Sequence, residues 1–160
     1  MRKIKAQKLT VENFHPYGDF VDLLNPSGFH LGDFYRDQVM MILQGGMQMA
    51  FSPLVVHKPE RMIVSQAEFH NTAQEAVLCL DDDTVMHVAP ASKDPVPELT
   101  EAFIIPKGTL VRLHTGMWHL SLIPIHQETA HVLIVLPERI YNNDCMVVDY
   151  APDQQMEIEL

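Results

Sequence analysis

Residues 101–125, EAFIIPKGTLVRLHTGMWHLSLIPI, decide the fold, because they hold three short apolar runs and the turn residues between them. The runs are residues 102–105, 110–114 and 118–125, and the turn Pro106-Lys107-Gly108 separates the first two. Each run is shorter than the ~10–12 residues of an ordinary helix and is rich in β-branched and large apolar residues. This stretch therefore predicts consecutive β-strands.

The same pattern extends over the whole chain. No helix of three turns can be placed, and only residues 10–14 are helical in pattern, with Thr10 as the expected N-cap. Many runs are apolar throughout, which is typical of strands covered on both faces. The other predicted strands are residues 40–43, 47–56, 62–70, 76–80, 85–88, 131–136 and 146–149. We expect an all-β fold, a closed or two-sheet barrel, in one domain over residues 1–160.

Composition and charge narrow the class of partner. Of 160 residues, 47% are hydrophobic and 20% are charged, which is ordinary for a globular domain and argues against disorder. Lys and Arg number 11 against 21 Asp and Glu, so the net charge is −10. Nucleic acids and anionic membranes bind basic patches, and the acidic remainder outweighs the small basic cluster in residues 2–8. We therefore expect a small-molecule substrate and neither nucleic acid nor membrane as a partner.

The cellular compartment follows from what the sequence lacks. No apolar N-terminal segment resembles a signal peptide, and the apolar run at residues 132–136 is far shorter than the ~20 residues of a spanning helix. Two cysteines, Cys79 and Cys145, cannot build a disulfide framework. We expect a cytoplasmic protein whose cysteines are reduced and take no part in catalysis.

Alternation along the predicted strands groups the polar side chains by face. Successive side chains on a strand point to opposite faces. Arg112 and His114 therefore share one face of their strand, and Glu68 and His70 share one face of theirs. If the leucines at 120 and 122 face outward, His119 points into the barrel. A single bulge would reverse these assignments.

One group of polar residues could carry the chemistry: Glu68, His70, Gln74, Glu75 and His119. Imidazole and carboxylate together bind divalent transition metals. Residues 68–75 resemble the first metal motif of the cupins, where two histidines one residue apart are followed by a carboxylate. Residues 106–119 resemble the second motif, where a Pro-x-Gly turn precedes a histidine. Two interpretations stay open: His70 and His119 contact the substrate with no cofactor, or a divalent metal is bound by Glu68, His70, Gln74 and His119.

Segments spread over most of the chain form a wider pattern. They are Phe14-His15-Pro16-Tyr17-Gly18-Asp19, Glu68-Phe69-His70 with Gln74, Val88-Ala89-Pro90, Ala102-Phe103-Ile104, Gly116-Met117-Trp118-His119 with His114, and Asn143-Asp144-Cys145. Together they resemble the ureidoglycolate lyase family, once called ureidoglycolate hydrolases, and the Trp-His segment is the most specific. The resemblance implies a cupin-like double-stranded β-helix, a jelly-roll barrel that is usually a homodimer. It also implies a lyase that splits ureidoglycolate into glyoxylate and urea in allantoin-derived purine nitrogen salvage.

The implied reaction suggests roles for the candidate residues. Elimination of urea needs a base for the hydroxyl proton, an acid for the departing nitrogen, and a cation or donors for the carboxylate. An imidazole titrates near the working pH, so we expect His119 or His70 to be the base. Glu68 would orient an imidazole or join a metal. We expect the substrate to be bound by Gln74, Arg112 and His114.

Three apolar residues keep alternatives open. Leu120 stands where the family has a second histidine, and Leu136-Pro137 stands where it has an Asp-Arg pair. A more apolar pocket would suit a cupin-fold lyase, isomerase or hydrolase acting on another small hydroxy acid. A non-catalytic small-molecule binding module is the other alternative. We also expect a homodimer, since apolar edge strands need cover, and residues 154–160 could add an edge strand.

Overall fold

The computed structural model describes residues 1–42 and 45–160, and its regular structure is almost entirely β-strand. Its short helices are α1 (Val11–Phe14), the 3-10 turn η1 (Pro97–Leu99) and α2 (Ile140–Asn143). The strands are β1 (Arg2–Lys8), β2 (Gly18–Asp22), β3 (His30–Leu31), β4 (Phe34–Tyr35), β5 (Met49–His57), β6 (Ile63–Val64), β7 (Gln66–Phe69), β8 (Ala76–Cys79), β9 (Thr84–Ala89), β10 (Glu101–Ile105), β11 (Thr109–Leu113), β12 (Trp118–His119), β13 (Ile123–Pro124), β14 (Thr129–Pro137), β15 (Met146–Asp149) and β16 (Met156–Glu159).

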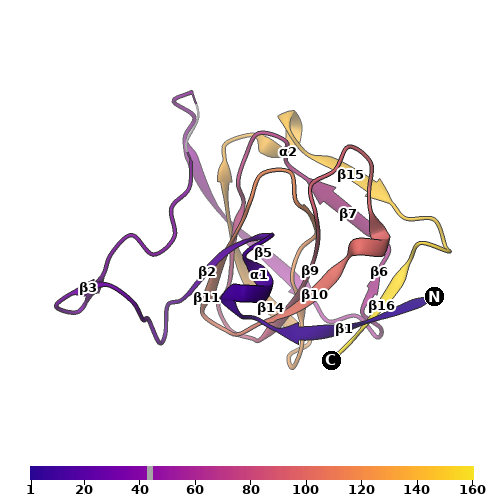
Figure 1. Cartoon of the computed structure of the whole chain (residues 1–160), viewed down its shortest axis with the longest axis horizontal. Coiled ribbons are helices and arrows are strands. Elements are labelled where there is room, and N and C mark those ends of the chain that lie inside the picture. Colours follow the sequence, from indigo (N-terminus) through magenta and orange to yellow (C-terminus); the bar gives the residue numbers. More distant parts are fainter. Residues whose placement is uncertain (43–44) are drawn as a thin grey trace.

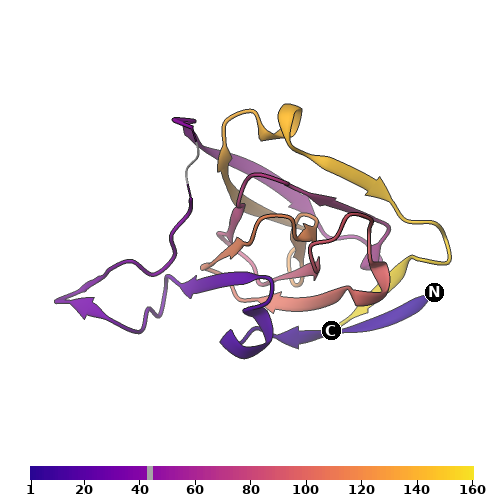
Figure 2. The ribbon, with the colours of Figure 1, turned by 45° about the horizontal axis from the view of Figure 1, so that its top comes forward.

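Two sheets curl around a common interior, as Figures 1 and 2 show. The larger sheet has the strand order β15-β7-β12-β9-β10-β1-β16-β6, and β13 also pairs with β9. The smaller sheet has the order β2-β11-β8-β14-β5. Most of these neighbours pair antiparallel, and strands far apart in the sequence lie side by side. The predicted all-β, cupin-like barrel is therefore confirmed.

The interior between the sheets is filled by one apolar cluster. Val77, Val111 and Val132 enter it from the smaller sheet, and Val88 and Phe103 enter it from the larger one. Each is at most 2% exposed. Burying one such side chain stabilises the fold by about 1.5–3 kcal/mol. This cluster holds the two sheets against each other.

The larger sheet is also covered on its other face. Ala89, Ala102, Trp118 and Met156 belong to a second buried cluster, built from β1, β6, β7, β9, β10, β12 and β16. Strands covered on both faces are mostly apolar, and all six residues of β9 are buried, although Thr84 and His87 are polar. This explains the continuous apolar runs in the sequence.

Some predictions for single helices and strands are confirmed and others are wrong. Helix α1 begins as predicted, because the Thr10 hydroxyl accepts a hydrogen bond from the backbone N–H of Asn13 at 3.3 Å. The strand predicted at residues 40–43 is absent at 40–42, and residue 43 lies outside the described residues. The run at 118–125 is divided into β12 and β13 by residues 120–122. The tail does add a strand, but β16 pairs with β1 and β6 of its own chain.

A long excursion, residues 23–42, leaves the barrel between β2 and β5 and is called the arm here. Its tip is the hairpin of β3 and β4, which reaches away from the barrel in both views (Figures 1 and 2). Of the described residues, no helix is long and apolar enough to cross a membrane.

Candidate functional site

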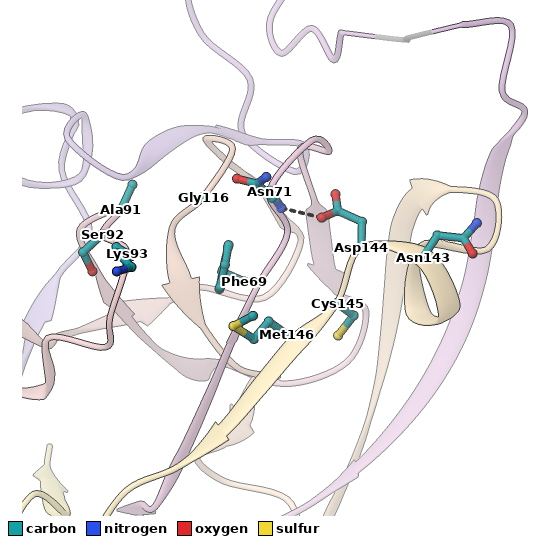
Figure 3. Close-up of a pocket in the computed structure, with 10 residues that line it drawn as sticks. All are labelled: Phe69, Asn71, Ala91, Ser92, Lys93, Gly116, Asn143, Asp144, Cys145 and Met146. Carbon is teal, nitrogen blue, oxygen red and sulfur yellow. Dashed lines mark hydrogen bonds between the residues drawn. The ribbon is translucent and has the colours of Figure 1, made fainter.

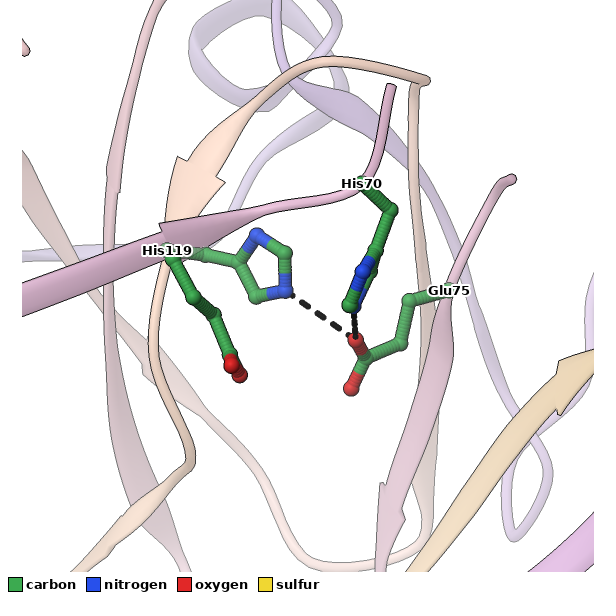
Figure 4. A group of neighbouring side chains, drawn as sticks. His70, Glu75 and His119 are labelled. Atoms are coloured by element: carbon green, nitrogen blue, oxygen red, sulfur yellow. Dashed lines mark hydrogen bonds and ion pairs between the residues drawn. The ribbon is translucent and has the colours of Figure 1, made fainter. Parts of the chain in front are cut away.

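Three strands bring one carboxylate and two imidazoles together inside the barrel (Figure 4). His70 directly follows β7, Glu75 directly precedes β8, and His119 ends β12. Strand β7 pairs with strand β12, and Glu68 lies directly opposite His119 in this pair. Both side chains therefore point to the inner face. The site thus joins the second and third strands of the larger sheet to the central strand of the smaller one.

Alternation aims these side chains inward. On the other side of β12, Trp118 packs against Phe69 in the second apolar cluster, with ring centroids 4.5 Å apart and the rings tilted by 60°. The residue after Trp118 must therefore point to the interior, and His119 does so with 3% of its surface exposed. Glu75 precedes Val77 by two residues, and Val77 belongs to the interior cluster. Glu75 therefore shares the inner face of β8.

Both imidazoles present the same ring nitrogen to the same oxygen. The Nε2 atoms of His70 and His119 lie 2.9 Å and 3.0 Å from Oε2 of Glu75. Their Nδ1 atoms lie 2.7 Å and 2.8 Å from the carbonyl oxygens of Asp144 and Met117. A carbonyl can only accept, so each Nδ1 carries the hydrogen it donates. Each Nε2 then either carries a proton for Glu75 or offers a lone pair to a cation.

Glu75 forms an ion-paired cluster with His70 and His119. Burial disfavours the Glu75 carboxylate, but hydrogen bonds and positive charge from His119 and His70 outweigh it and lower the pKa of Glu75 to about 2. Burial also lowers the pKa of His70 and of His119, but the hydrogen bonds and charge of Glu75 outweigh it and raise both above the ordinary 6.5. The buried carboxylate therefore stays ionised and retains protons on its imidazole neighbours.

The same atoms suit a divalent transition metal. Glu68, His70, Glu75 and His119 each offer a ligand atom, and these atoms all lie within 4.8 Å of one another. Imidazole nitrogen with carboxylate oxygen is a donor set for Mn, Fe, Ni or Zn. Metal-binding histidines usually donate their other ring N–H to a carbonyl or carboxylate, as both histidines do here. The residues present fit a metal ion.

A small cavity of about 230 Å³ opens on this cluster. Glu68 and Glu75 give it two carboxylates, and no Lys or Arg is among the described residues that line it. The Ser121 hydroxyl is buried there without a hydrogen-bond partner among the described residues. The complete lining is Ser52, Pro53, Leu54, Glu68, Glu75, Ser121, Ile134 and Tyr141. The cavity is therefore acidic, with one apolar wall.

A segment from α2 to β15 closes over the site. The Asp144 carboxylate accepts hydrogen bonds from the backbone N–H groups of Asn71 at 2.8 Å and Thr72 at 2.7 Å. The Cys145 thiol donates to Glu68 over 3.2 Å. Burial, followed by the bond to Glu68, raises the pKa of this thiol to about 12, so Cys145 is protonated and not a nucleophile.

The same segment lines an outer cleft of about 600 Å³, which Figure 3 shows. Phe69 and Met146 form part of its wall, and Asn71 and Lys93 are among its polar residues. Phe69 belongs to the second apolar cluster, so this cleft lies on the other face of β7 from the imidazole cluster. It is larger than the inner cavity, but the convergent acid–base groups lie in the inner one.

Comparison with known proteins identifies the family. The family model described as ureidoglycolate lyase matches residues 1–159. The chain belongs to this family. Curated relatives include ureidoglycolate lyases from Pseudomonas aeruginosa strain UCBPP-PA14, at 24% identity over 99% of this chain and 97% of the relative, and from Pseudomonas syringae pv. syringae strain B728a, at 25% over 99% and 96%.

Solved structures with a similar fold are more distant. A dTDP-6-deoxy-D-glucose-3,5-epimerase from Legionella pneumophila matches with a TM-score of 0.46 and 12% identity, covering 70% of this chain and 59% of that one. Bacillus subtilis oxalate decarboxylase matches with a TM-score of 0.45 and 16% identity, covering 64% of this chain and 24% of that one.

Of the predicted site residues, the structure brings together Glu68, His70 and His119. It does not bring the predicted substrate-binding residues to them. Arg112 lies on the outer face of β11, forms an ion pair with Asp19 and donates to the carbonyl of Met40 at 3.0 Å. The prediction that Arg112 and Val111 point to opposite faces of the strand is right, but it is Val111 that points to the interior.

Gln74 and His114 are also directed elsewhere. The side-chain oxygen of Gln74 accepts the backbone N–H of Ile42 at 2.9 Å, so Gln74 supports the arm and is replaced in the metal-binding group by Glu75. The His114 ring lies 3.3 Å from the carbonyl of His15. Glu75 was part of the sequence pattern but had no predicted role, although the cupin motif ends in a carboxylate.

Proposed function

We propose that this protein cleaves ureidoglycolate to glyoxylate and urea at the inner cavity, with a divalent metal ion held by His70, Glu75 and His119. Family membership supports the reaction. The cavity of about 230 Å³ suits a small acid, being below the ~300–1,000 Å³ of pockets for drug-sized ligands.

The charge of the cavity carries the metal proposal. Ureidoglycolate is a carboxylate, and the described lining holds Glu68 and Glu75 with no Lys or Arg. Two like charges about 4 Å apart repel by roughly 4 kcal/mol at an effective dielectric of 20. An anion would enter this cavity only beside a cation that Glu75 does not already neutralise, and both imidazoles are already paired with Glu75. A bound divalent ion would supply that charge and act as a Lewis acid toward the oxygens of the substrate.

The remaining steps, proton transfer and hydrogen bonding to the urea group, would be carried out by side chains of the protein. We propose that Glu68, which faces the cavity, takes the hydroxyl proton of the substrate. The electron pair of that O–H bond forms the new carbonyl of glyoxylate, and the bond from carbon to the urea nitrogen breaks. The hydroxyls of Ser121 and Tyr141 line the same cavity and would donate hydrogen bonds to the urea group. The protonated Glu68 then gives this proton to the departing nitrogen, so neutral urea leaves, the Glu68 carboxylate is restored, and atoms and charge balance.

The test is glyoxylate release from ureidoglycolate by the purified protein. We expect activity that a chelator abolishes and one divalent metal restores, together with metal in the protein by elemental analysis. His70→Ala and His119→Ala should each lose both metal and activity. Arg112→Gln is the control: KM should stay within about twofold of wild type, because Arg112 faces away from the cavity. No release by the metal-loaded protein would overturn the proposal.

One observation favours a second candidate, an enzyme of this fold acting on a less polar hydroxy acid. Pro53, Leu54 and Ile134 give the cavity an apolar wall. Leu136, which suggested this alternative in the sequence, is buried in the interior cluster instead. Assays of small 2-hydroxy acids with apolar substituents, run beside ureidoglycolate, would identify this candidate by a higher kcat/KM.

The remaining expectations are retained as proposals. The two free cysteines support a cytoplasmic location, which cell fractionation would test. Purine nitrogen salvage would be tested by growth on allantoin after deletion of the gene. We also propose a single domain, which would unfold in one cooperative transition, and a homodimer with a small-molecule substrate and no nucleic acid or membrane partner.

A further inference from the structure

The outer cleft, which takes no part in the proposed reaction, has the volume of a ligand site (Figure 3). Its volume of about 600 Å³ lies within the ~300–1,000 Å³ of pockets that bind small molecules. Strands β7 and β15 form one side of the cleft, and residues 91–93, which follow β9, form another. These segments are far apart in the sequence, so the cleft exists only in the folded chain.

The side formed by residues 91–93 is held in place by a buried anchor. The Ser92 hydroxyl accepts a hydrogen bond from the indole N–H of Trp118 at 2.9 Å and donates one to the carbonyl of Asp94 at 2.6 Å. Trp118 belongs to the second apolar cluster and is 1% exposed. A cleft whose walls are already ordered loses little conformational entropy when a ligand binds. The cleft is therefore preformed around Lys93.

Phe69 and Met146 give the cleft an apolar surface. They lie directly opposite each other in the antiparallel pair of β7 and β15, so their side chains point to the same face. The Phe69 ring is fixed by its packing against Trp118, whereas Met146 is 54% exposed. An aromatic ring beside an exposed thioether favours a planar, polarisable ligand such as a heterocyclic ring.

Three polar side chains of the cleft have no partner among the described residues. The Lys93 ammonium forms no ion pair with them, and the side-chain amides of Asn71 and Asn143 form no hydrogen bond with them. The acid in the lining, Asp144, is already satisfied, because its carboxylate accepts the backbone N–H groups of Asn71 and Thr72 and the Thr72 hydroxyl. The unpaired charge of the cleft is therefore positive, and each free amide can both donate and accept.

We propose that the outer cleft binds a planar cyclic amide that carries a carboxylate, at a site separate from the reaction cavity. The ring would lie against Phe69 and Met146, and the carboxylate would pair with Lys93. The side-chain amides of Asn71 and Asn143 would exchange hydrogen bonds with the N–H and C=O groups of the ring, which offer the complementary donors and acceptors. Because this site lies on the other face of β7 from the imidazole cluster, the inference does not depend on the proposed reaction.

The test is isothermal titration calorimetry of the purified full chain with orotate and with isoorotate, which carry the carboxylate at different positions of a uracil ring. We expect at least one of them to bind one molecule per chain, with a Kd below about 1 mM. Uracil lacks the carboxylate and benzoate lacks the cyclic amide, so each should bind at least about 5-fold more weakly than the better carboxylate probe. Binding of neither orotate nor isoorotate would overturn the proposal.

Two variants at exposed positions identify the groups that contact the probe. Lys93→Gln should weaken the carboxylate probe by at least about 5-fold and leave the affinity for uracil unchanged, because uracil carries no charge. Asn71→Ala keeps the backbone N–H that Asp144 accepts, and it should weaken the carboxylate probe and uracil but not benzoate. Lys58→Gln is the matched control, since Lys58 is an exposed lysine outside the cleft. It should leave every affinity unchanged.

Nuclear magnetic resonance and competition separate the cleft from the inner cavity. The methyl signal of Met146, assigned through Met146→Leu, should shift when the probe binds, and excess glyoxylate should not displace the probe. Displacement by glyoxylate or an unchanged Met146 signal would overturn the proposal. An affinity that Lys93→Gln leaves intact, or a loss that is equal for uracil and the carboxylate probe, would overturn it as well.

Discussion

Replacing Glu75 with glutamine tests the geometry on which the site depends. Glutamine keeps the shape of the side chain and removes its charge. In the metal-free protein, one carboxylate oxygen lies 2.9 Å and 3.0 Å from the Nε2 atoms of His70 and His119. The variant leaves two buried imidazoles without the charge that holds their protons. Their pKa values should fall, and both should become neutral at mildly acidic pH.

The size of the effect follows from two charge-assisted hydrogen bonds, each worth about 1.5–3 kcal/mol. We expect Glu75→Gln to lower the free energy of unfolding by about 3 kcal/mol. The pKa values of His70 and His119 are raised in the folded protein. Their contribution to the free energy of unfolding is therefore complete below the unfolded-state pKa of 6.5, and it is lost as pH rises through their folded-state pKa values. Because the pKa of Glu75 is lowered, its contribution is present above 4.5 and is lost as pH falls toward about 2. The loss of stability in Glu75→Gln should therefore be largest between pH 4.5 and pH 6.5.

Urea unfolding of chelator-treated protein measures this difference. The variant should be less stable by about 3 kcal/mol near pH 5 and closer to wild type at a pH above the folded pKa values of both histidines, where glutamine can donate to neutral imidazoles. Calorimetric titration with Mn²⁺ or Zn²⁺ should show at least about a 100-fold weaker affinity, since a direct ligand is lost. An equal loss of stability at both pH values, or unchanged metal affinity, would refute the reasoning.

Three further changes test supporting contacts. The Asp82 carboxylate accepts three backbone N–H groups, and these hydrogen bonds outweigh burial and lower its pKa. Asp82→Asn should therefore lower the free energy of unfolding by about 2 kcal/mol at a pH above the ordinary carboxyl pKa, and by little in strong acid. Urea unfolding measured at several pH values checks this. Asp144→Ala releases the segment whose carbonyl holds His70, so metal affinity by calorimetry should fall about 10-fold with stability changed far less. Gly108→Ala should lower the free energy of unfolding by about 2 kcal/mol, which thermal melts measure. The φ of Gly108 is +76°, and a Cβ at this position would lie 2.5 Å from Leu24.

The fold could be predicted because its signal is local. Short apolar runs and turn residues identify strands whatever their partners, and nearly continuous apolar runs indicate cover on both faces. The order of strands could not be predicted, since β1 pairs with β10 and β16 at the far end of the chain. Strands β1 and β2 were not predicted, because their lysine and aspartate residues hide an apolar pattern of only a few positions.

The site shows the limit of alternation as a guide. Parity states which residues share a face, but not which face is the interior. Arg112 and Val111 were correctly separated, yet the interior belongs to Val111, so the expected substrate cation lies outside. Residues 120–122 add a second error. They leave the strand after His119 and return Leu122 to the interior cluster, although the prediction for His119 is right.

The choice between Gln74 and Glu75 shows what information was missing. The two residues are adjacent, so a strand must send one inward and the other outward, and either could end the cupin motif. The backbone of Glu75 settles this, because its carbonyl accepts the N–H of Leu113 at 2.8 Å and fixes the register of β8 against β11. That register depends on a residue 38 positions away, which no local pattern contains. A shift of one residue would place an amide beside the two imidazoles and the carboxylate beneath the arm, and the barrel would lose its charged centre.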